Sequence, residues 1–383
     1  MEPQISKSAQ NPEYKIIPFE FTGKAGEYFS IWIVNMALTI LTLGIYSAWA
    51  KVRTQQYLYG STRLDGASFR YLADPKQILK GRLIAAVFFA AYYFSGLLSP
   101  VVGAATAVVL LVLMPYILVA SMSFRARISE WRHVRLGFVK DYSKAYKLAA
   151  IPLIIVALNT VLPVLLLGQD DLNSWQHGKA GLTWYTFVLI GLTFLFLLMI
   201  PWLDHAINQY RFQQLKFGRQ QFTFKSALGK FHRFYIYGGF VLPLVFISGG
   251  FGLMGLLGGL DILAQTKDLL GVVGVLMYFW LAAYFQTRRR NAVLNNVTLG
   301  NFRLYSKLTI TKMWFLYISN TIAIVCSIGL LYPWAKIRTL RYKASKTGVI
   351  ALSDMSVFAA DQLQHQSALG EEMGEFFDMD IGI

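Results

Sequence analysis

The sequence is poor in charge and almost free of cysteine. Charged residues make up 15% of its 383 residues and hydrophobic ones 55%, whereas a soluble globular chain carries about 25% charged residues. A water-soluble fold of this length would need more polar surface to cover its core. Its one cysteine, Cys326, lies in an apolar run. It excludes an intramolecular disulfide and a cluster of thiolate metal ligands, so we expect a small buried hydrophobic residue there.

The sequence contains eight long apolar runs. Most reach the roughly 20 residues that cross a bilayer as a helix, and an open strand would leave its amides unpaired in lipid. The eight runs are 28–48, 83–99, 101–124, 148–168, 183–203, 236–259, 269–285 and 313–334. We therefore predict an all-α integral membrane protein, a polytopic helical bundle with internal repeats and six to eight membrane helices.

The composition divides the chain into three parts. Residues 1–27 form a polar segment without the apolar centre of a cleavable signal peptide. Residues 28–346 form the predicted polytopic transmembrane domain, built of repeated helix and basic-loop modules. Residues 347–383 form an acidic tail with seven acidic residues and no Lys or Arg. We expect a solvated tail; docking on the protein's own basic modules is the alternative.

The net charge of +16 is concentrated between the apolar runs. Four connections, 49–82, 125–147, 204–235 and 287–312, carry 7, 7, 6 and 6 Lys plus Arg. By the positive-inside rule these four face the cytoplasm. Because topology needs only a few basic residues per loop, the excess predicts anionic phospholipids of the cytoplasmic face as partners, or an unidentified acidic protein. Basic residues that flank apolar runs do not indicate nucleic acid.

The first and last apolar runs are copies of each other. Shifted by 285 residues they align without a gap, so that Asn35 falls on Asn320 and residues 49–54 fall on 334–339. If both runs span, the chain crosses eight times and the five basic residues of 334–346 lie outside. If both are re-entrant hairpins, the chain crosses six times with both ends inside. The repeat and its charges favour the second arrangement, and the segment lengths favour the first.

The middle runs also repeat. Three of them end with an aromatic residue followed nine positions later by Arg, as in Trp202 and Arg211. After each basic stretch comes a Gly with an aromatic residue close behind: Gly66 and Phe69, Gly137 and Phe138, Gly218 and Phe222, Gly300 and Phe302. We interpret each glycine as a turn with positive φ and each aromatic residue as an interfacial anchor.

Several short motifs resemble the YjgN-like family of bacterial inner-membrane proteins. They are Phe21-x-Gly23, Thr42–Tyr46, Trp49–Arg53, Leu64–Phe69 and the ending Asp378–Ile383. A Pro commonly precedes the motif's Trp, and here the first copy has Ala48 and the second Pro333. The resemblance covers nearly the whole chain and implies a multi-pass protein of the bacterial inner membrane. It implies no reaction, substrate or cofactor.

The candidate site residues fall into three groups. Lipid headgroup or interfacial contacts are expected from Trp49, Lys51, Arg53, Trp334, Lys336 and Arg338. Intramembrane polar roles are expected from Asn35 and Asn320, as helix–helix contacts or as the lining of a passage. Asp204 and His205 form a membrane-edge pair that could bind a metal or relay a proton, although neighbours at i and i+1 do not face each other on a helix.

No catalytic constellation is visible in the sequence. The five histidines form no spaced metal motif, and there is no phosphate-binding glycine loop. We expect no enzymatic activity, cofactor or bound metal; cation binding at Asp170 and Asp171 is a weaker alternative. Intramembrane charges are scarce, which disfavours a proton-driven pump. The working hypothesis is a transporter or channel-like protein for an uncharged or amphipathic solute, and the alternative is a scaffold that binds lipid or a partner.

Overall fold

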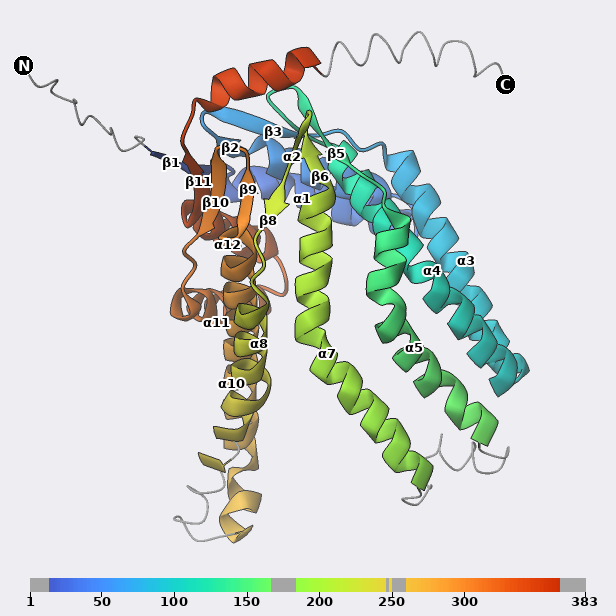
Figure 1. Ribbon diagram of the computed structural model, residues 1–383. Helices are drawn as coiled ribbons and strands as arrows, with labels where there is room; N and C mark the ends of the chain where they lie inside the picture. The colour runs from blue at the N-terminus through green and yellow to red at the C-terminus, as the bar shows by residue number, and fades with distance from the viewer. Residues whose placement is uncertain (1–13, 167–183, 246–247, 250–259, 366–383) are drawn as a thin grey trace, which may run out of the picture.

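The computed structural model describes residues 14–166, 184–245, 248–249 and 260–365. One curved sheet lies at one end of the molecule, and long helices run away from it in a common direction (Figure 1). The strands are β1 (Lys15–Phe21), β2 (Thr62–Leu64), β3 (Ala67–Tyr71), β4 (Ser129–Trp131), β5 (Val134–Phe138), β6 (Leu215–Phe217), β7 (Gln220–Gln221), β8 (Thr223–Phe224), β9 (Val297–Leu299), β10 (Phe302–Ser306) and β11 (Thr347–Ala351).

The sheet curls into a ring. Its order is β7-β6-β5-β4-β3-β2-β1-β11-β10-β9-β8, and every pairing is antiparallel. The two strands at the ends of this order, β7 and β8, are separated in the chain by Phe222 alone. The order therefore returns to its starting point, and we call the eleven strands the barrel. β1 and β11, from opposite ends of the chain, pair from Lys15–Ala351 to Pro18–Gly348.

The prediction of an all-α fold is therefore wrong. Nine of the strands, β2 to β10, lie in the stretches interpreted from the sequence as basic loops, whereas β1 lies in the polar N-terminal segment and β11 at the start of the acidic tail. The strands are two to seven residues long, and alternate residues point out of the barrel, where Arg135, Lys216 and Arg303 lie between apolar neighbours. Such short alternating runs resemble solvated loops, and the partner of a strand can lie hundreds of residues away.

The inside of the barrel is packed with apolar and aromatic side chains. Ile17, Leu64, Trp131, Phe217 and Phe302 are all buried there, as expected for the inward residues of strands with a period of two. A cavity of about 220 Å³ remains among them. A helix over residues 355–365 closes the outer end of the barrel, with Met355 and Ala359 buried in the same core (Figure 1).

The helices form five hairpins that extend from the barrel. The elements are α1 (Ala25–Leu41), α2 (Ser47–Gly60), α3 (Pro75–Leu98), α4 (Pro100–Arg127), α5 (Tyr142–Leu166), α7 (Trp184–Gln214), α8 (Leu228–Ile236), the π-helical turn η1 (Tyr237–Val241), α10 (Leu260–Leu294), α11 (Ile310–Cys326) and α12 (Tyr332–Ser345). Within the described residues each hairpin packs on the next: α2 on α3, α4 on α5, α7 on α8, α10 on α11, and α12 on α1.

The central hairpins have the properties of membrane spans. Among the described residues, α3, α4, α5 and α7 are each long and apolar enough to cross a bilayer, and at most 11% of their apolar windows is buried in the protein. Their side chains therefore need lipid around them. α8, η1 and α10 run in the same direction as these four helices (Figure 1).

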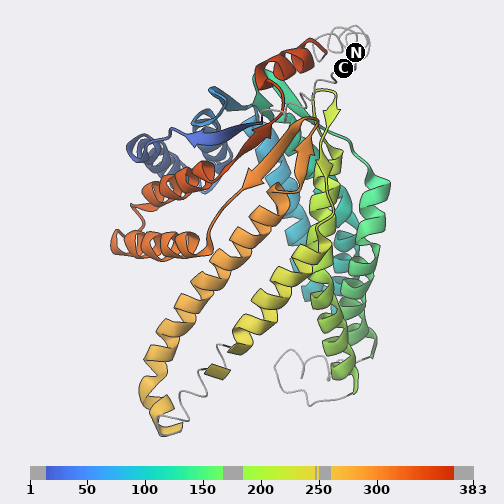
Figure 2. The ribbon, with the colours of Figure 1, turned by 60° about the vertical axis from the view of Figure 1, so that its left-hand side comes forward.

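The terminal hairpins, α1–α2 and α11–α12, run sideways from the barrel instead of along the central helices (Figure 2). α1 and α11 are only 17 residues long. Both ends of each terminal hairpin meet barrel strands, so every basic connection lies on the barrel side. This geometry matches the second topological alternative, in which the terminal segments return and do not cross. The positive-inside rule then predicts that the barrel faces the cytoplasm.

The predicted glycine turns are confirmed at three of four positions. Gly66, Gly218 and Gly300 have φ of 73°, 58° and 53°, and each lies in a turn between strands. Gly137 lies inside β5 instead, and Arg132 and His133 supply the positive φ of that turn. The interfacial role expected of the aromatic residues is wrong for Phe69, Phe222 and Phe302, because Phe302 is buried in the barrel core and Phe69 and Phe222 pack against that core.

Candidate functional site

Each terminal hairpin is held together by an asparagine. The Nδ2 of Asn35 donates to the carbonyl of Ala50 at 3.4 Å, and that of Asn320 donates to Ala335 at 3.3 Å. Both bonds join residues 15 apart, from the first helix of the hairpin to the second. The two asparagines thus bond inside their own hairpins and do not meet, and neither lines a cavity found among the described residues.

The tips of the terminal hairpins are apolar and exposed. Leu43 is 95% exposed and Ile328 is 94% exposed. Both have positive φ, at 49° and 51°, and are followed by Gly44 and Gly329 at 93° and 89°. A bulky residue in this conformation is uncommon, so the tight reversal forces these side chains outward. Cys326, expected to be buried, is exposed near the second tip, since the hairpin reverses there instead of continuing as a span.

The cations of the repeated Trp-Ala-Lys-x-Arg motif differ between the two hairpins. Lys51 and Arg53 on α2 are exposed. Lys336 on α12 is half-buried and donates to the Tyr28 hydroxyl of α1 at 2.9 Å, over the same ring. Arg338 donates to Ser319 at 2.7 Å and to Asn320 at 3.1 Å. Of the four cations among the predicted headgroup contacts, Lys51 and Arg53 are therefore the exposed ones.

The two tryptophans of the motif stand beside these cations. Trp49 is half-buried and stacks on Tyr46, with ring centroids 6.2 Å apart. Trp334 is exposed, and the guanidinium of Arg338 lies 5.1 Å from its ring centroid. An indole with one face packed and one edge exposed suits the boundary between lipid tails and headgroups.

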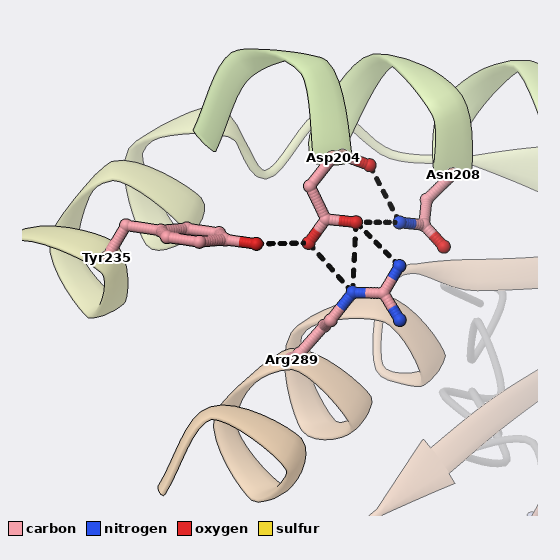
Figure 3. Close-up of polar contacts among 4 residues, drawn as sticks. All are labelled: Asp204, Asn208, Tyr235 and Arg289. Carbon is pink, nitrogen blue, oxygen red and sulfur yellow. Dashed lines mark hydrogen bonds and ion pairs between the residues drawn. The ribbon is translucent and has the colours of Figure 1, made fainter. Parts of the chain in front are cut away.

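Asp204 and His205 bind different partners and do not form the predicted membrane-edge pair. The Asp204 carboxylate accepts from Arg289 Nε at 2.8 and 2.9 Å, from Arg289 Nη2 at 2.6 Å and from the Tyr235 hydroxyl at 3.2 Å (Figure 3). Asn208 Nδ2 adds a fourth donor group at 2.9 Å. This carboxylate links α7, α8 and α10, and all its partners are protein groups.

His205 contacts the beginning of α8, away from the groups that bind Asp204. Its Nε2 accepts the backbone N–H of Ala227 at 3.2 Å, just before α8 begins. Its ring lies between Phe224 and Phe231, at centroid distances of 5.7 and 5.4 Å. The residue therefore satisfies a helix-terminal donor in an aromatic setting, which does not favour a metal or proton-relay role.

The described residues hold no group of three or more His, Cys, Asp or Glu side chains suited to a metal ion. Asp170, Asp171 and His177 lie outside the described residues. The sequence did not indicate Arg289 and Tyr235 as partners of Asp204. The sequence did single out Arg289 as a repeated position, because Arg289 follows Trp280 by nine positions as Arg211 follows Trp202.

The fold and these contacts define a polytopic helical membrane protein with a strand barrel on one side. The chain belongs to the family described as bacterial protein of unknown function (DUF898), which matches residues 16–376. It is 27% identical over 379 residues to the inner membrane protein YjgN of Salmonella typhimurium strain LT2, covering 90% of each chain. It is 22% identical over 369 residues to YjgN of Escherichia coli K12, covering 90% of this chain and 91% of the relative. No solved structure matches.

The protein is accordingly a multi-pass protein of the bacterial inner membrane, as the sequence predicted. The family description and the names of these relatives give no activity. What the protein does must therefore be argued from its surfaces and cavities.

Proposed function

We propose that the protein is a non-catalytic membrane scaffold that binds anionic phospholipids of the cytoplasmic leaflet. The observation that carries this proposal is the pair of terminal hairpins, with Leu43 and Ile328 almost fully exposed at their tips. An exposed leucine or isoleucine beside exposed cations is typical of a segment that lies in the membrane interface.

The charges near the first tip support the choice of lipid. Lys51 and Arg53 are exposed one to two turns into α2, and no carboxylate pairs with them among the described residues. A basic residue near an anionic leaflet contributes on the order of 1 kcal/mol to binding. Hairpins that are apolar at the tip and basic along the side would therefore prefer anionic headgroups over zwitterionic ones.

Transport of an amphipathic solute is a second candidate. One observation favours it, an apolar cavity of about 280 Å³ between α4, α5 and α7. The packed barrel supports the scaffold instead, because aromatic side chains and the helix over 355–365 stand across the barrel axis. Asn35 and Asn320, the residues predicted to line a passage, are buried against backbone carbonyls.

The test is lipid association in reconstituted membranes. The purified full chain is placed in phosphatidylcholine bilayers with spin-labelled phosphatidylglycerol or phosphatidylcholine, and the motionally restricted fraction of each is measured by EPR. We expect a preference for phosphatidylglycerol that falls as salt is raised. Equal association of both lipids would contradict the proposal.

Two double variants assign the preference to the hairpin. Lys51→Gln with Arg53→Gln should lower it, whereas Lys15→Gln with Arg63→Gln, which removes two exposed charges from the barrel wall, should leave it unchanged. Movement of fluorescent lipid between leaflets, measured in the same vesicles, would favour transport if it depended on the protein.

A further inference from the structure

Three consecutive arginines on α10 have three different surroundings. Arg289 pairs with Asp204, and Arg290 Nη2 donates to the Thr347 hydroxyl at 3.5 Å. Arg288 is exposed, and its guanidinium lies 5.8 Å from the ring centroid of Tyr284. No carboxylate pairs with Arg288 among the residues that the structure describes. Since successive helix residues point about 100° apart, only Arg288 is directed away from the groups that neutralise or bind its neighbours.

Arg288 lines an open pocket of about 690 Å³ between α8, η1 and α10. Two more cations, Lys230 and Arg233, line the same pocket from α8. Both are exposed, and across the described chain neither forms an ion pair. At the start of α5, by contrast, Lys144 Nζ donates to Gln213 at 3.0 Å and so has a partner.

The rest of the pocket wall is aromatic and apolar. Trp280, Tyr237 and Leu242 line it farther from the barrel. Its two amide side chains, Asn291 and Asn295, are already engaged, since their Oδ1 atoms accept from Ser306 at 2.7 Å and their Nδ2 atoms donate to backbone carbonyls. The groups left to bind a ligand are therefore three cations at one end and an apolar wall at the other.

This arrangement is complementary to an anionic phospholipid. Three cations without a carboxylate partner line one pocket, and a phosphate can accept charge-assisted hydrogen bonds from such groups. A free phosphate ion would make no apolar contact with Trp280 and Leu242. A phospholipid would, because its acyl chains continue from the phosphate into hydrocarbon, in the direction in which α8 and α10 extend from the barrel (Figure 1).

We propose that Lys230, Arg233 and Arg288 bind the phosphate of one anionic phospholipid, whose acyl chains lie along Trp280 and Leu242. This site rests on the proposed function, since it requires the barrel side to lie at an anionic leaflet. It goes further in naming a discrete site that holds one lipid, separate from the terminal hairpins.

Native mass spectrometry of the full chain in detergent tests the site. The protein is titrated with phosphatidylglycerol and, separately, with phosphatidylcholine of the same acyl chains. We expect one phosphatidylglycerol to be retained at concentrations at which phosphatidylcholine is not. The triple variant Lys230→Gln, Arg233→Gln, Arg288→Gln should bind it at least about tenfold more weakly, because each basic residue contributes separately.

The matched control removes three other exposed cations, by Lys76→Gln, Lys80→Gln and Lys140→Gln, which do not line the pocket. It should retain the lipid as the wild type does. If the triple variant misfolds, Arg233→Gln alone, at an exposed position, should still weaken retention about threefold or more. Equal retention in the triple variant and the control would overturn the site.

Two further results separate the possible failures. If millimolar inorganic phosphate displaces the retained lipid completely and binds with the same dependence on the three cations, the pocket is a phosphate site and the lipid proposal is wrong. If EPR shows the anionic preference in bilayers but no lipid is retained in detergent, the discrete site fails and the proposed function stands. If the preference itself is absent, both fail.

Discussion

The two terminal hairpins share their internal bonds but differ in their cations. In both, the asparagine of the first helix bonds the carbonyl 15 residues later. In both, a tyrosine hydroxyl accepts the backbone N–H at the start of the hairpin, Tyr57 from Lys24 at 2.8 Å and Tyr342 from Thr309 at 3.0 Å. These contacts lie within one copy of the repeat, so duplication preserves them.

The neighbours of the hairpins account for the difference. α12 packs on α1, which brings Lys336 against Tyr28, whereas α2 packs on α3 and leaves Lys51 and Arg53 exposed. A repeated motif therefore predicts the fold of each copy, and the position of the copy in the ring decides which of its charges are free to contact a ligand.

The largest difference between the copies is expected at the asparagines. Asn320 bonds Ala335, Thr339 and Arg338, whereas Asn35 makes one long bond and its buried Oδ1 has no partner. Asn320→Leu should lower the free energy of unfolding by about 2–3 kcal/mol because it leaves buried polar partners unpaired. Asn35→Leu should cost less than about 1 kcal/mol. Denaturant titration in detergent measures both, and equal losses would show that the copies do not differ in this way.

The sequence predicted the hairpins much better than the barrel. The repeat at a spacing of 285 identified the asparagines and the shared Trp-Ala-Lys-x-Arg motif because both lie within one local segment. The pairing of β1 with β11 joins strands more than 300 residues apart, and β7 has two residues. Neither gives a local periodic signal, so the strands were read as loops.

The same limit applies to the candidate sites. The sequence placed Asp204 beside His205, but the partner of that carboxylate is Arg289, 85 residues later. The cations of the pocket come from α8 and α10, and nothing in their spacing indicates that these two helices face each other. Which residues meet follows from the ring of hairpins, which depends on the strands that the sequence analysis missed.

The copies also differ where the half-buried Lys343 occupies the place of the buried Leu58. Burial and the nearby charge of Arg290 lower the pKa of Lys343 to about 8, against about 10.4 in an unfolded chain. Below pH 8 the full cost of burying the charge is present, and it is relieved as pH rises toward 10.4. Lys343→Leu should therefore stabilise the protein by about 1.5 kcal/mol at pH 7, and the gain should shrink above pH 8.

Thermal unfolding of this variant and the wild type between pH 6.5 and 10 checks that expectation. Leu58→Met serves as the control in the other copy, where a change of pH should have no comparable effect. A gain from Lys343→Leu that is constant over the whole range would contradict a lowered lysine pKa.

A smaller loss of stability, equal in the two copies, is expected from substitution of the shared tyrosines. Tyr57→Phe and Tyr342→Phe each remove a hydroxyl that accepts a backbone N–H, at a cost of about 1 kcal/mol. Because the contact lies inside the repeat, the two losses should agree within about 0.5 kcal/mol. A much larger loss at one tyrosine, measured in the same denaturant titration, would show that contacts from outside the copy dominate.

The smallest effect on stability is expected at Arg53. Its exposed side chain should tolerate Arg53→Gln within about 0.5 kcal/mol, while the EPR preference for phosphatidylglycerol falls. Arg338→Gln should do the reverse, because its guanidinium bonds Ser319 and Asn320. If both variants changed lipid preference equally, the neighbours of a hairpin would not decide which cations meet lipid.

The central claim is that every helical hairpin begins and ends on the barrel side of the membrane. A Cys326→Ser background allows single cysteines to be labelled with a membrane-impermeant maleimide in vesicles of known orientation. Ser68→Cys, between the first two hairpins, and Ser353→Cys, after the last, should both react only from the cytoplasmic side. Leu98→Cys, at the far end of α3, should react only from the opposite side. Reaction of Ser68→Cys and Ser353→Cys from opposite sides would contradict the account.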